Sequence, residues 1–432
     1  MKETRLITGL KNGLKGELAV PGDKSISHRA LLIGAISQGK TVIDHFLKSQ
    51  DCLHTLGALQ QLGVTITEQN SQVQVWGQGI EHLSPSAAPL EMGNSGTTTR
   101  LMLGLLAGRP FDSYFQGDAS LSQRPMKRVS EPLAKMGAEI ALTAAGTLPA
   151  KVKGHKLHGE KIALQVASAQ VKSAVIFAGL QADNPTKIIE KLPTRNHTEL
   201  MLRQFGAEII TAADQRTITV IPKPKLLGQQ IQVPGDPSSA AFFMAAATLV
   251  PESSIILKNV SLNPTRTGFL RILQKMGGKV SILNQTKLSE NSGDLKVESA
   301  KLHAIQLTAA DIPAVIDELP LVALLAARAT GKSKITGAEE LRVKETDRIA
   351  TVTEELSKLG VNIQELPDGL VISGSTKWQP VTNQLDSHGD HRIGMMLAVA
   401  ALCIQGSLEL QQADAVKISY PGFFADLQQL IV

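Results

Sequence analysis

Six times along the chain, a short polar cluster leads directly into an almost wholly apolar run of helical length. The clusters begin at Gly22, Gly93, Ala167, Gly235, Ile316 and Gly389, roughly 70 residues apart. Runs such as 240–250 and 319–327 are apolar on every side, which predicts helices buried inside a domain. A polar start to a buried helix leaves backbone N–H groups free at the positive end of the helix dipole. The pattern therefore predicts six potential anion sites.

A second series of shorter, amphipathic segments follows the same period. Each ends in Gly and precedes a strand-like run; the segments are 59–63, 133–137, 202–206, 273–277 and 356–360. Gly directly after the last apolar helical position is a C-cap signal, and the alternating residues beyond it are typical of a strand. Each repeat is thus predicted to be a βαβαββ-type unit, and the chain an α/β protein.

Two domains of three repeats each are favoured over one continuous solenoid. Val20-Pro21-Gly22-Asp23 recurs as Val233-Pro234-Gly235-Asp236, which marks the start of a second set of three. The sixth repeat stops at 427–432 without a closing strand, and the strand-like segment 6–20 could supply it. We therefore expect one domain from residues 1–20 and 235–432, an inserted domain from 21–234, and hinge crossings near 21 and 234.

Composition narrows the class of protein. A chain of 432 residues with 43% hydrophobic residues is long enough for two domains, and we expect neither a membrane-spanning run nor a secretory leader. Two cysteines favour a reducing compartment, and a net charge of +5 with 3% aromatic residues argues against a nucleic-acid platform. We expect a cytoplasmic, monomeric protein without nucleic-acid or membrane partners.

The first helix start carries cations that its duplicate lacks. In Lys24-Ser25-Ile26-Ser27-His28-Arg29, a Ser at the start is followed one turn later by Arg29, so hydroxyl, cation and N–H groups can face one ligand. The fourth start reads Asp236-Pro-Ser-Ser-Ala-Ala-Phe instead, which favours a structural role there. The alternative for the first start is an N-cap with solvated charges.

The second and third starts add small and polar groups. The segment 93–100 offers Gly for close backbone approach, hydroxyls and a terminal Arg, and Arg124 follows it. Ser168 and Gln170 can orient a hydroxyl-bearing ligand, with Arg195 further along. Solvated faces and simple capping loops are the alternatives.

Carboxylates come from the fifth and sixth repeats. Asp317 opens an apolar helix, where it could equally be a cap that stabilises the dipole. Lys344 and Arg348 flank Glu345 at i, i+4 spacing, which could be a surface ion-pair ladder. Inside an anion-binding cleft the same groups would be candidates for proton transfer. The adjacent residues 386–391 lack a second cluster at metal-ligand spacing, so no metal and no cofactor are expected.

Taken together, these motifs closely resemble the 5-enolpyruvylshikimate-3-phosphate synthase family, class II branch. The resemblance rests on 21–29, 93–100, Arg124-Pro125-Met126-x-Arg128, 344–348, 390–392 and 420–424, in order along the whole chain. It implies two similar domains of three repeats with buried parallel helices, an inverse α/β barrel. It also implies a transferase that moves the enolpyruvyl group of phosphoenolpyruvate to the 5-hydroxyl of shikimate 3-phosphate and releases phosphate.

The resemblance assigns site residues one by one. Shikimate 3-phosphate is expected at Lys24, Ser25, Arg29, Ser168, Ala169, Gln170, Arg195, Asp317 and Lys344. Phosphoenolpyruvate is expected at Lys24, Gly96, Arg124, Gln170, Arg348 and Arg392. Asp317 is the expected base for the attacking hydroxyl, and Lys24 and Glu345 are the candidates for protonating the methylene. Gly96 keeps the small residue of the glyphosate-sensitive pattern, so sensitivity is a hypothesis.

Two other functions fit parts of the pattern. The related UDP-N-acetylglucosamine enolpyruvyl transferases usually carry a Cys in a loop of the first domain, and no Cys lies between Cys52 and Cys403 here. A non-catalytic anion-binding repeat protein would explain the helix starts but not the acids.

Overall fold

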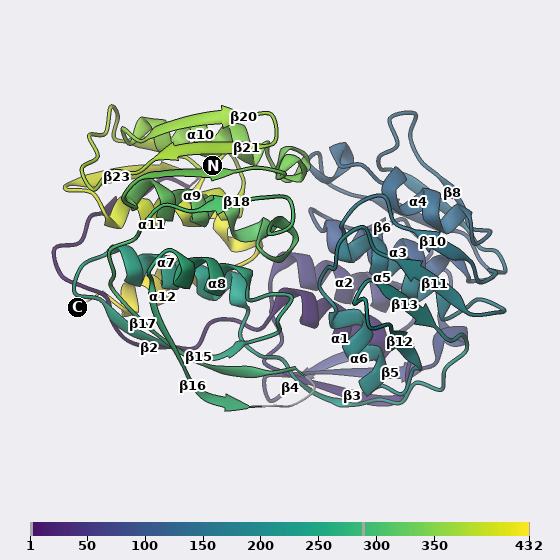
Figure 1. Cartoon of the computed structure of the whole chain (residues 1–432). Helices are drawn as coiled ribbons and strands as arrows, with labels where there is room; N and C mark the ends of the chain where they lie inside the picture. The colour runs from purple at the N-terminus through teal and green to yellow at the C-terminus, as the bar shows by residue number, and fades with distance from the viewer. Residues whose placement is uncertain (1–2, 287–289, 432) are drawn as a thin grey trace. The chain divides into compact units, whose positions relative to one another are not determined.

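The chain forms two compact α/β units that are built on the same repeat (Figure 1). The computed structural model describes residues 3–286 and 290–431. One unit comprises Met1–Pro21 and Pro234–Val432, and the other comprises Gly22–Val233. The chain thus passes between units at residues 21/22 and 233/234. The predicted α/β class is confirmed.

Three repeats make up the unit Gly22–Val233. The helices are α1 (Lys24–Ala35), α2 (Gln50–Gln61), α3 (Gly96–Ala107), α4 (Lys127–Ala134), α5 (Ala169–Gly179) and α6 (His197–Gln204). The strands are β3 (Gln38–Asp44), β4 (Thr65–Gln69), β5 (Gln72–Gln78), β6 (Leu90–Glu91), β7 (Ser113–Gln116), β8 (Glu139–Ala141), β9 (Ala150–Lys153), β10 (Lys161–Ala163), β11 (Thr186–Ile189), β12 (Ile209–Thr211), β13 (Thr217–Val220) and β14 (Gln230–Gln232).

Each repeat of this unit makes one four-stranded sheet. In the order β6-β7-β9-β8, the first two strands are parallel because a helix connects them, and the last two form an antiparallel hairpin. The sheet β10-β11-β13-β12 has the same pattern. The first sheet, β14-β3-β5-β4, takes its parallel edge strand β14 from the end of the unit.

The other unit repeats this plan. Its helices are α7 (Pro237–Leu249), α8 (Gly268–Lys275), α9 (Leu319–Arg328), α10 (Arg348–Lys358), α11 (His391–Leu402) and α12 (Phe423–Gln429). Its strands are β1 (Arg5–Thr8), β2 (Lys15–Leu18), β15 (Ser254–Ser261), β16 (Lys279–Thr286), β17 (Ser292–Glu298), β18 (Gln306–Leu307), β19 (Lys332–Ile335), β20 (Asn362–Leu366), β21 (Gly369–Ser373), β22 (Gln384–Asp386) and β23 (Ser407–Gln411).

The N-terminal segment completes two different sheets. As expected, β1 closes the sixth repeat by pairing antiparallel with β23. The segment does more than predicted, because β2 pairs in parallel with β15 and completes the sheet of the fourth repeat. One short stretch therefore ties the first and last repeats of this unit together.

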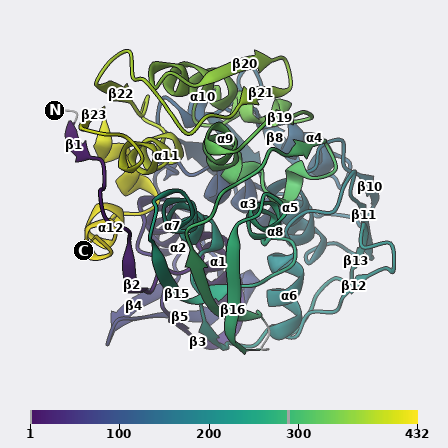
Figure 2. The ribbon, with the colours of Figure 1, turned by 60° about the vertical axis from the view of Figure 1, so that its left-hand side comes forward.

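The apolar helices lie in the interior, as their sequences predict. Every residue of 238–249 in α7 and 391–402 in α11 is buried. Figures 1 and 2 show α7, α9 and α11 between the sheets of their unit. In the other unit α3 packs on α5 so closely that a Cβ at Gly104 would lie 2.0 Å from the Ala174 carbonyl oxygen. Only glycine permits this approach.

The glycines that close the second helix of five repeats adopt the left-handed conformation. Their φ angles are 87° at Gly63, 93° at Gly137, 106° at Gly206, 95° at Gly277 and 83° at Gly360. The predicted C-caps are confirmed. Among the described residues, no helix is both long and apolar enough to cross a membrane.

Candidate active site

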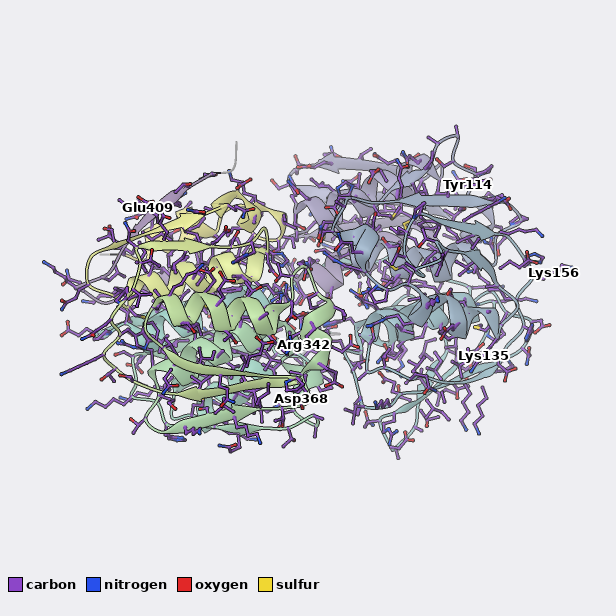
Figure 3. All side chains as sticks on the ribbon, turned by 90° about the horizontal axis from the view of Figure 1, so that it is seen from above. Tyr114, Lys135, Lys156, Arg342, Asp368 and Glu409 are labelled. Atoms are coloured by element: carbon purple, nitrogen blue, oxygen red, sulfur yellow. The ribbon has the colours of Figure 1, made fainter. Side chains whose placement is uncertain are left out.

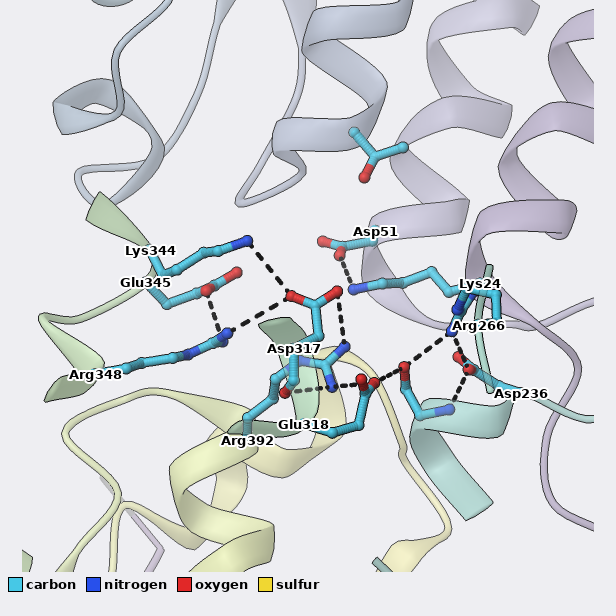
Figure 4. A network of polar contacts seen from close by, with 12 residues as sticks. Lys24, Asp51, Asp236, Arg266, Asp317, Glu318, Lys344, Glu345, Arg348 and Arg392 are labelled. Carbon is cyan, nitrogen blue, oxygen red and sulfur yellow. Dashed lines mark hydrogen bonds and ion pairs between the residues drawn. The ribbon is translucent and has the colours of Figure 1, made fainter. Parts of the chain in front are cut away.

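The first helix start holds its cations in fixed positions. Asp23 caps α1 by accepting a hydrogen bond from the Ile26 amide at 2.9 Å, and Lys24 is the first helical residue. The Lys24 ammonium lies 3.0 Å from a carboxylate oxygen of Asp51 (Figure 4). Sequence reasoning missed Asp51, although an acid in the first turn of the next helix was a visible signal.

Arg29 is buried, so its charge is not solvated as the alternative proposed. Its Nε donates to the Thr198 hydroxyl at 2.6 Å and its Nη2 donates to the Ser173 hydroxyl at 2.8 Å. Its Nη1 donates to the Ser25 carbonyl oxygen at 2.9 Å. Hydrogen bonds on all three nitrogens fix the plane of the guanidinium, which suits the recognition of a phosphate.

His28, one residue earlier, is neutral. Complete burial lowers its pKa to about 3, because an imidazolium would lose its hydration there. Its Nδ1 lies 2.7 Å from the Thr55 hydroxyl, which in turn lies 2.6 Å from the hydroxyl of Thr98 in α3. His28 therefore links the first two repeats and does not bind anions.

The second and third helix starts meet through side-chain hydrogen bonds. Gly96 is the first residue of α3, and Arg124 donates to the Asn94 carbonyl oxygen at 3.3 Å and to its amide oxygen at 2.5 Å. Gln170 in α5 donates to the Thr97 hydroxyl at 2.9 Å. Gly96, Arg124 and Gln170 therefore belong to one cluster, which is where the resemblance expects phosphoenolpyruvate.

The remaining groups of this unit flank α5 and α6. Ser168 caps α5 through the Val171 amide, and Ala169 is the first helical residue. Arg195 lies in the loop just before α6 and is partly exposed.

In the other unit, three cations surround Asp317. This residue lies in a 3₁₀ turn, Ile316–Glu318, just before α9. Its carboxylate oxygens lie 3.4 Å from Lys344 Nζ, 3.9 Å from Arg348 Nη1 and 3.8 Å from Arg392 Nη2 (Figure 4). Glu318, not Asp317, occupies the N-cap position of α9, and the Asp317 carboxylate lies among these cations instead.

Arg348 is held by two carboxylates. Its Nε lies 2.7 Å from Asp390 and its Nη2 lies 2.7 Å from Glu345, with only 1% of the side chain exposed. Burial alone would lower the pKa of Arg348, but the charges of Asp390 and Glu345 outweigh it and raise this pKa. Burial alone would raise the pKa of Asp390, but the Arg348 charge holds it below its ordinary value. Arg348 thus remains a fixed cation.

The segment 344–348 is not a surface ion-pair ladder. The helix α10 begins only at Arg348, so Lys344 and Glu345 precede it and do not share a helical face with Arg348. Asp347 caps α10 through the Ile349 and Ala350 amides at 3.1 Å. Arg342, labelled in Figure 3, forms an ion pair with Asp347, with 2.7 Å between Nη1 and Oδ2.

The fourth helix start is paired with a cation from outside its own segment. Arg266 comes from a distant segment and donates to Asp236 and to the Ser238 hydroxyl, both at 2.9 Å. The Ser238 hydroxyl donates in turn to Glu318, which lies 3.7 Å from Arg392. This start therefore supports the neighbours of Asp317. No pattern in the sequence links Arg266 to Asp236.

The predicted residues divide between the two units, and we call each set a half-site. The half-site of Gly22–Val233 holds Lys24, Ser25, Arg29, Gly96, Arg124, Ser168, Ala169, Gln170 and Arg195. The half-site of the other unit holds Asp317, Lys344, Glu345, Arg348 and Arg392.

One group of potential metal ligands occurs in the described part of the chain, and it lies outside both half-sites. Glu354, Glu355 and His388 bring their ligand atoms within 4.8 Å of one another. The Lys358 ammonium lies 3.0 Å from Glu354 and 2.6 Å from Glu355, so a positive charge already occupies this group.

The fold defines the class of protein. The enolpyruvyl transferase NikO from Streptomyces tendae superposes with a TM-score of 0.79 at 17% identity, covering 100% of this chain and 98% of its own. The EPSP synthase of Acinetobacter baumannii superposes with a TM-score of 0.87 at 39% identity, covering 99% and 98%. The chain thus has the fold of enolpyruvyl transferases.

The sequence comparisons specify the family. Residues 10–427 match the family model of EPSP synthase (3-phosphoshikimate 1-carboxyvinyltransferase). The 3-phosphoshikimate 1-carboxyvinyltransferase of Lactiplantibacillus plantarum is 59% identical over 419 residues, 97% of each chain. That of Limosilactobacillus fermentum is 56% identical over 99% of each chain. The chain belongs to the EPSP synthase family, so the predicted family, fold and transferase class are confirmed.

Proposed function

We propose that this protein transfers the enolpyruvyl group of phosphoenolpyruvate to the 5-hydroxyl of shikimate 3-phosphate. The observation that carries the proposal is Asp317, a carboxylate beside Lys344, Arg348 and Arg392 in a chain that matches the family almost end to end. A base among cations suits a reaction that deprotonates a hydroxyl next to an anionic substrate.

Shikimate 3-phosphate would bind mainly to the half-site of Gly22–Val233. The fixed Arg29 guanidinium and the positive ends of α1 and α5 suit its phosphate. Its other ligands would be Lys24, Ser25, Ser168, Ala169, Gln170 and Arg195, with Asp317 and Lys344 from the other half-site.

Phosphoenolpyruvate carries a carboxylate and a phosphate, and it would need cations for both. The proposed ligands are Lys24, Gly96, Arg124, Gln170, Arg348 and Arg392. Arg348 is buried and oriented by Asp390, so little conformational entropy is lost when it binds an anion. The two half-sites would have to act together, with the crossings near 21 and 234 as the hinge.

The chemistry is an addition followed by an elimination. The 5-hydroxyl oxygen attacks C2 of phosphoenolpyruvate and gives its proton to Asp317, while the C3 methylene takes a proton from Lys24 or Glu345. The resulting tetrahedral ketal phosphate then breaks its C2–O bond to phosphate, which leaves with the proton that Asp317 had accepted. The methyl group returns one proton to the protein, which restores the double bond.

The test is phosphate release from phosphoenolpyruvate with either shikimate 3-phosphate or UDP-N-acetylglucosamine as acceptor. We expect release only with shikimate 3-phosphate. Release only with the sugar nucleotide would reject the assignment in favour of the related transferase. Binding of both anions without release would favour the non-catalytic protein. We further propose a cytoplasmic monomer, in keeping with two free cysteines.

A further inference from the structure

Lys172 is a buried cation that the proposed chemistry does not use. Its side chain is 1% exposed and lies in α5, two residues after Gln170. Its ammonium lies 3.0 Å from a Glu190 oxygen and 2.8 Å from a Glu199 oxygen, and it donates to the Thr194 carbonyl oxygen at 3.3 Å. One ammonium thus bridges α5, α6 and the loop between β11 and α6.

The residues next to this bridge hold Arg29. Ser173 follows Lys172 in α5, and Thr198 precedes Glu199 in α6; their hydroxyls lie 2.6 Å apart. Both hydroxyls accept hydrogen bonds from the Arg29 guanidinium. The Lys172–Glu199 pair therefore sets the register in which α5 and α6 hold Arg29, and α6 also packs against α1, which carries Arg29.

The second carboxylate shapes the loop that carries Arg195. Glu190 accepts hydrogen bonds from the Thr194 amide at 3.1 Å and from the Thr194 hydroxyl. Lys172 holds both ends of this turn, through the Glu190 carboxylate and the Thr194 carbonyl oxygen. Arg195 is the next residue, so this turn fixes the position of the Arg195 backbone.

Stability alone does not account for this arrangement. Burying one ammonium and two carboxylates costs desolvation free energy, and neutral groups of similar volume often stabilise such sites equally well. Burial raises the pKa of Glu190 despite the attraction of Lys172, which reflects this cost. The oxygen Oε2 of Glu199 is buried without a hydrogen-bond partner, so the network is not optimised for hydrogen bonding.

We propose that Lys172 is a positioning residue for shikimate 3-phosphate: it orients Arg29 and Arg195 through Glu199 and Glu190. The inference rests on the proposed function and adds to it a network behind the ligand groups. Lys172 contacts no substrate in this proposal, and it leaves the phosphoenolpyruvate ligands of the other unit untouched.

The test measures KM for each substrate in Lys172→Met. We expect the KM for shikimate 3-phosphate to rise about tenfold or more, because misplaced ligand groups lose binding energy. We expect the KM for phosphoenolpyruvate to stay within about twofold, because losing a binding contact to one substrate raises the KM of that substrate only. Ile176→Ala is the matched control: Ile176 is buried in the same helix but belongs to the apolar core, so both KM values should stay within about twofold.

A charge-free variant covers the case in which Lys172→Met does not fold. Lys172→Met with Glu190→Gln and Glu199→Gln removes all three charges and the desolvation cost together. We expect it to fold and to keep the raised KM for shikimate 3-phosphate. Normal KM values in this variant, or equal rises for both substrates, would overturn the proposal. If the unmodified protein releases no phosphate with shikimate 3-phosphate, the proposed function itself fails, and this inference falls with it.

Discussion

Replacing Asp317 by Asn should lower turnover and strengthen phosphoenolpyruvate binding at the same time. The change keeps the shape of the side chain but removes the proton acceptor. Loss of a general base typically costs about 10²- to 10⁴-fold in rate, or roughly 3–5 kcal/mol in the barrier. We therefore expect kcat to fall by about a thousandfold.

The effect on binding has the opposite sign because Asp317 shares its cations with the substrate. Its carboxylate lies 3.9 Å from Arg348 and 3.8 Å from Arg392, so an anion bound there would be repelled by it at short range. At about 5 Å in a water-like dielectric, two unit charges repel by roughly 1 kcal/mol. Removing the charge should tighten phosphoenolpyruvate binding about fivefold.

Steady-state phosphate release gives kcat, and equilibrium titration with phosphoenolpyruvate gives Kd. Asp347→Asn is the control, because Asp347 caps α10 nearby but pairs with Arg342 and not with the cations around Asp317. The control should leave both quantities within about twofold. A kcat for Asp317→Asn near that of the unmodified protein would remove its role as base. A Kd that weakens in parallel with kcat would refute the electrostatic argument.

Three further outcomes follow from the geometry. A Cβ at Gly96 would lie 3.3 Å from Nη1 of Arg124. Gly96→Ala should therefore raise the KM for phosphoenolpyruvate about three- to tenfold, as measured by phosphate release. The KM for shikimate 3-phosphate and the thermal midpoint should stay unchanged. His28 has its pKa lowered from 6.5 to about 3, so the unfolded state gains protons first and stability falls as pH drops below 6.5. In urea unfolding, the free energy of unfolding lost between pH 8 and pH 5 should be about 2 kcal/mol smaller in His28→Gln than in the unmodified protein. Equal losses in the two proteins would contradict this account of His28. Ser238→Ala removes a donor to the buried Glu318 carboxylate and should lower the free energy of unfolding by about 1.5–3 kcal/mol in the same assay; a change below about 0.5 kcal/mol would show that this hydrogen bond contributes little.

Much of the fold could be predicted because its signals are local. Apolar runs determine which helices are buried. Gly63 and Gly360 end their helices with positive φ angles, and this cap depends only on residues close by in the sequence. The same holds for the polar groups at helix starts, such as Lys24 and Ser168, since a cap and its first turn are adjacent in sequence. The recurrence of these patterns, six times for the helix starts and five times for the capping glycines, made the predictions more specific.

Most pairings between distant segments could not be predicted. The missing closing strand pointed to β1 in the sixth repeat, but nothing local shows that β2 joins the sheet of the fourth. The sequence alone left open whether 344–348 is a surface ladder, and the burial of Arg348 excludes it.

The sequence by itself determined the repeat, the buried helices and the residue types presented at each helix start, because these depend on periodicity and capping. Only the tertiary structure decided which charges meet. Arg266 reaches Asp236, and Lys172 reaches Glu190 and Glu199, because packing of the repeats brings these segments together. The energy of a buried charge depends on its partners in space, and a linear pattern does not contain them.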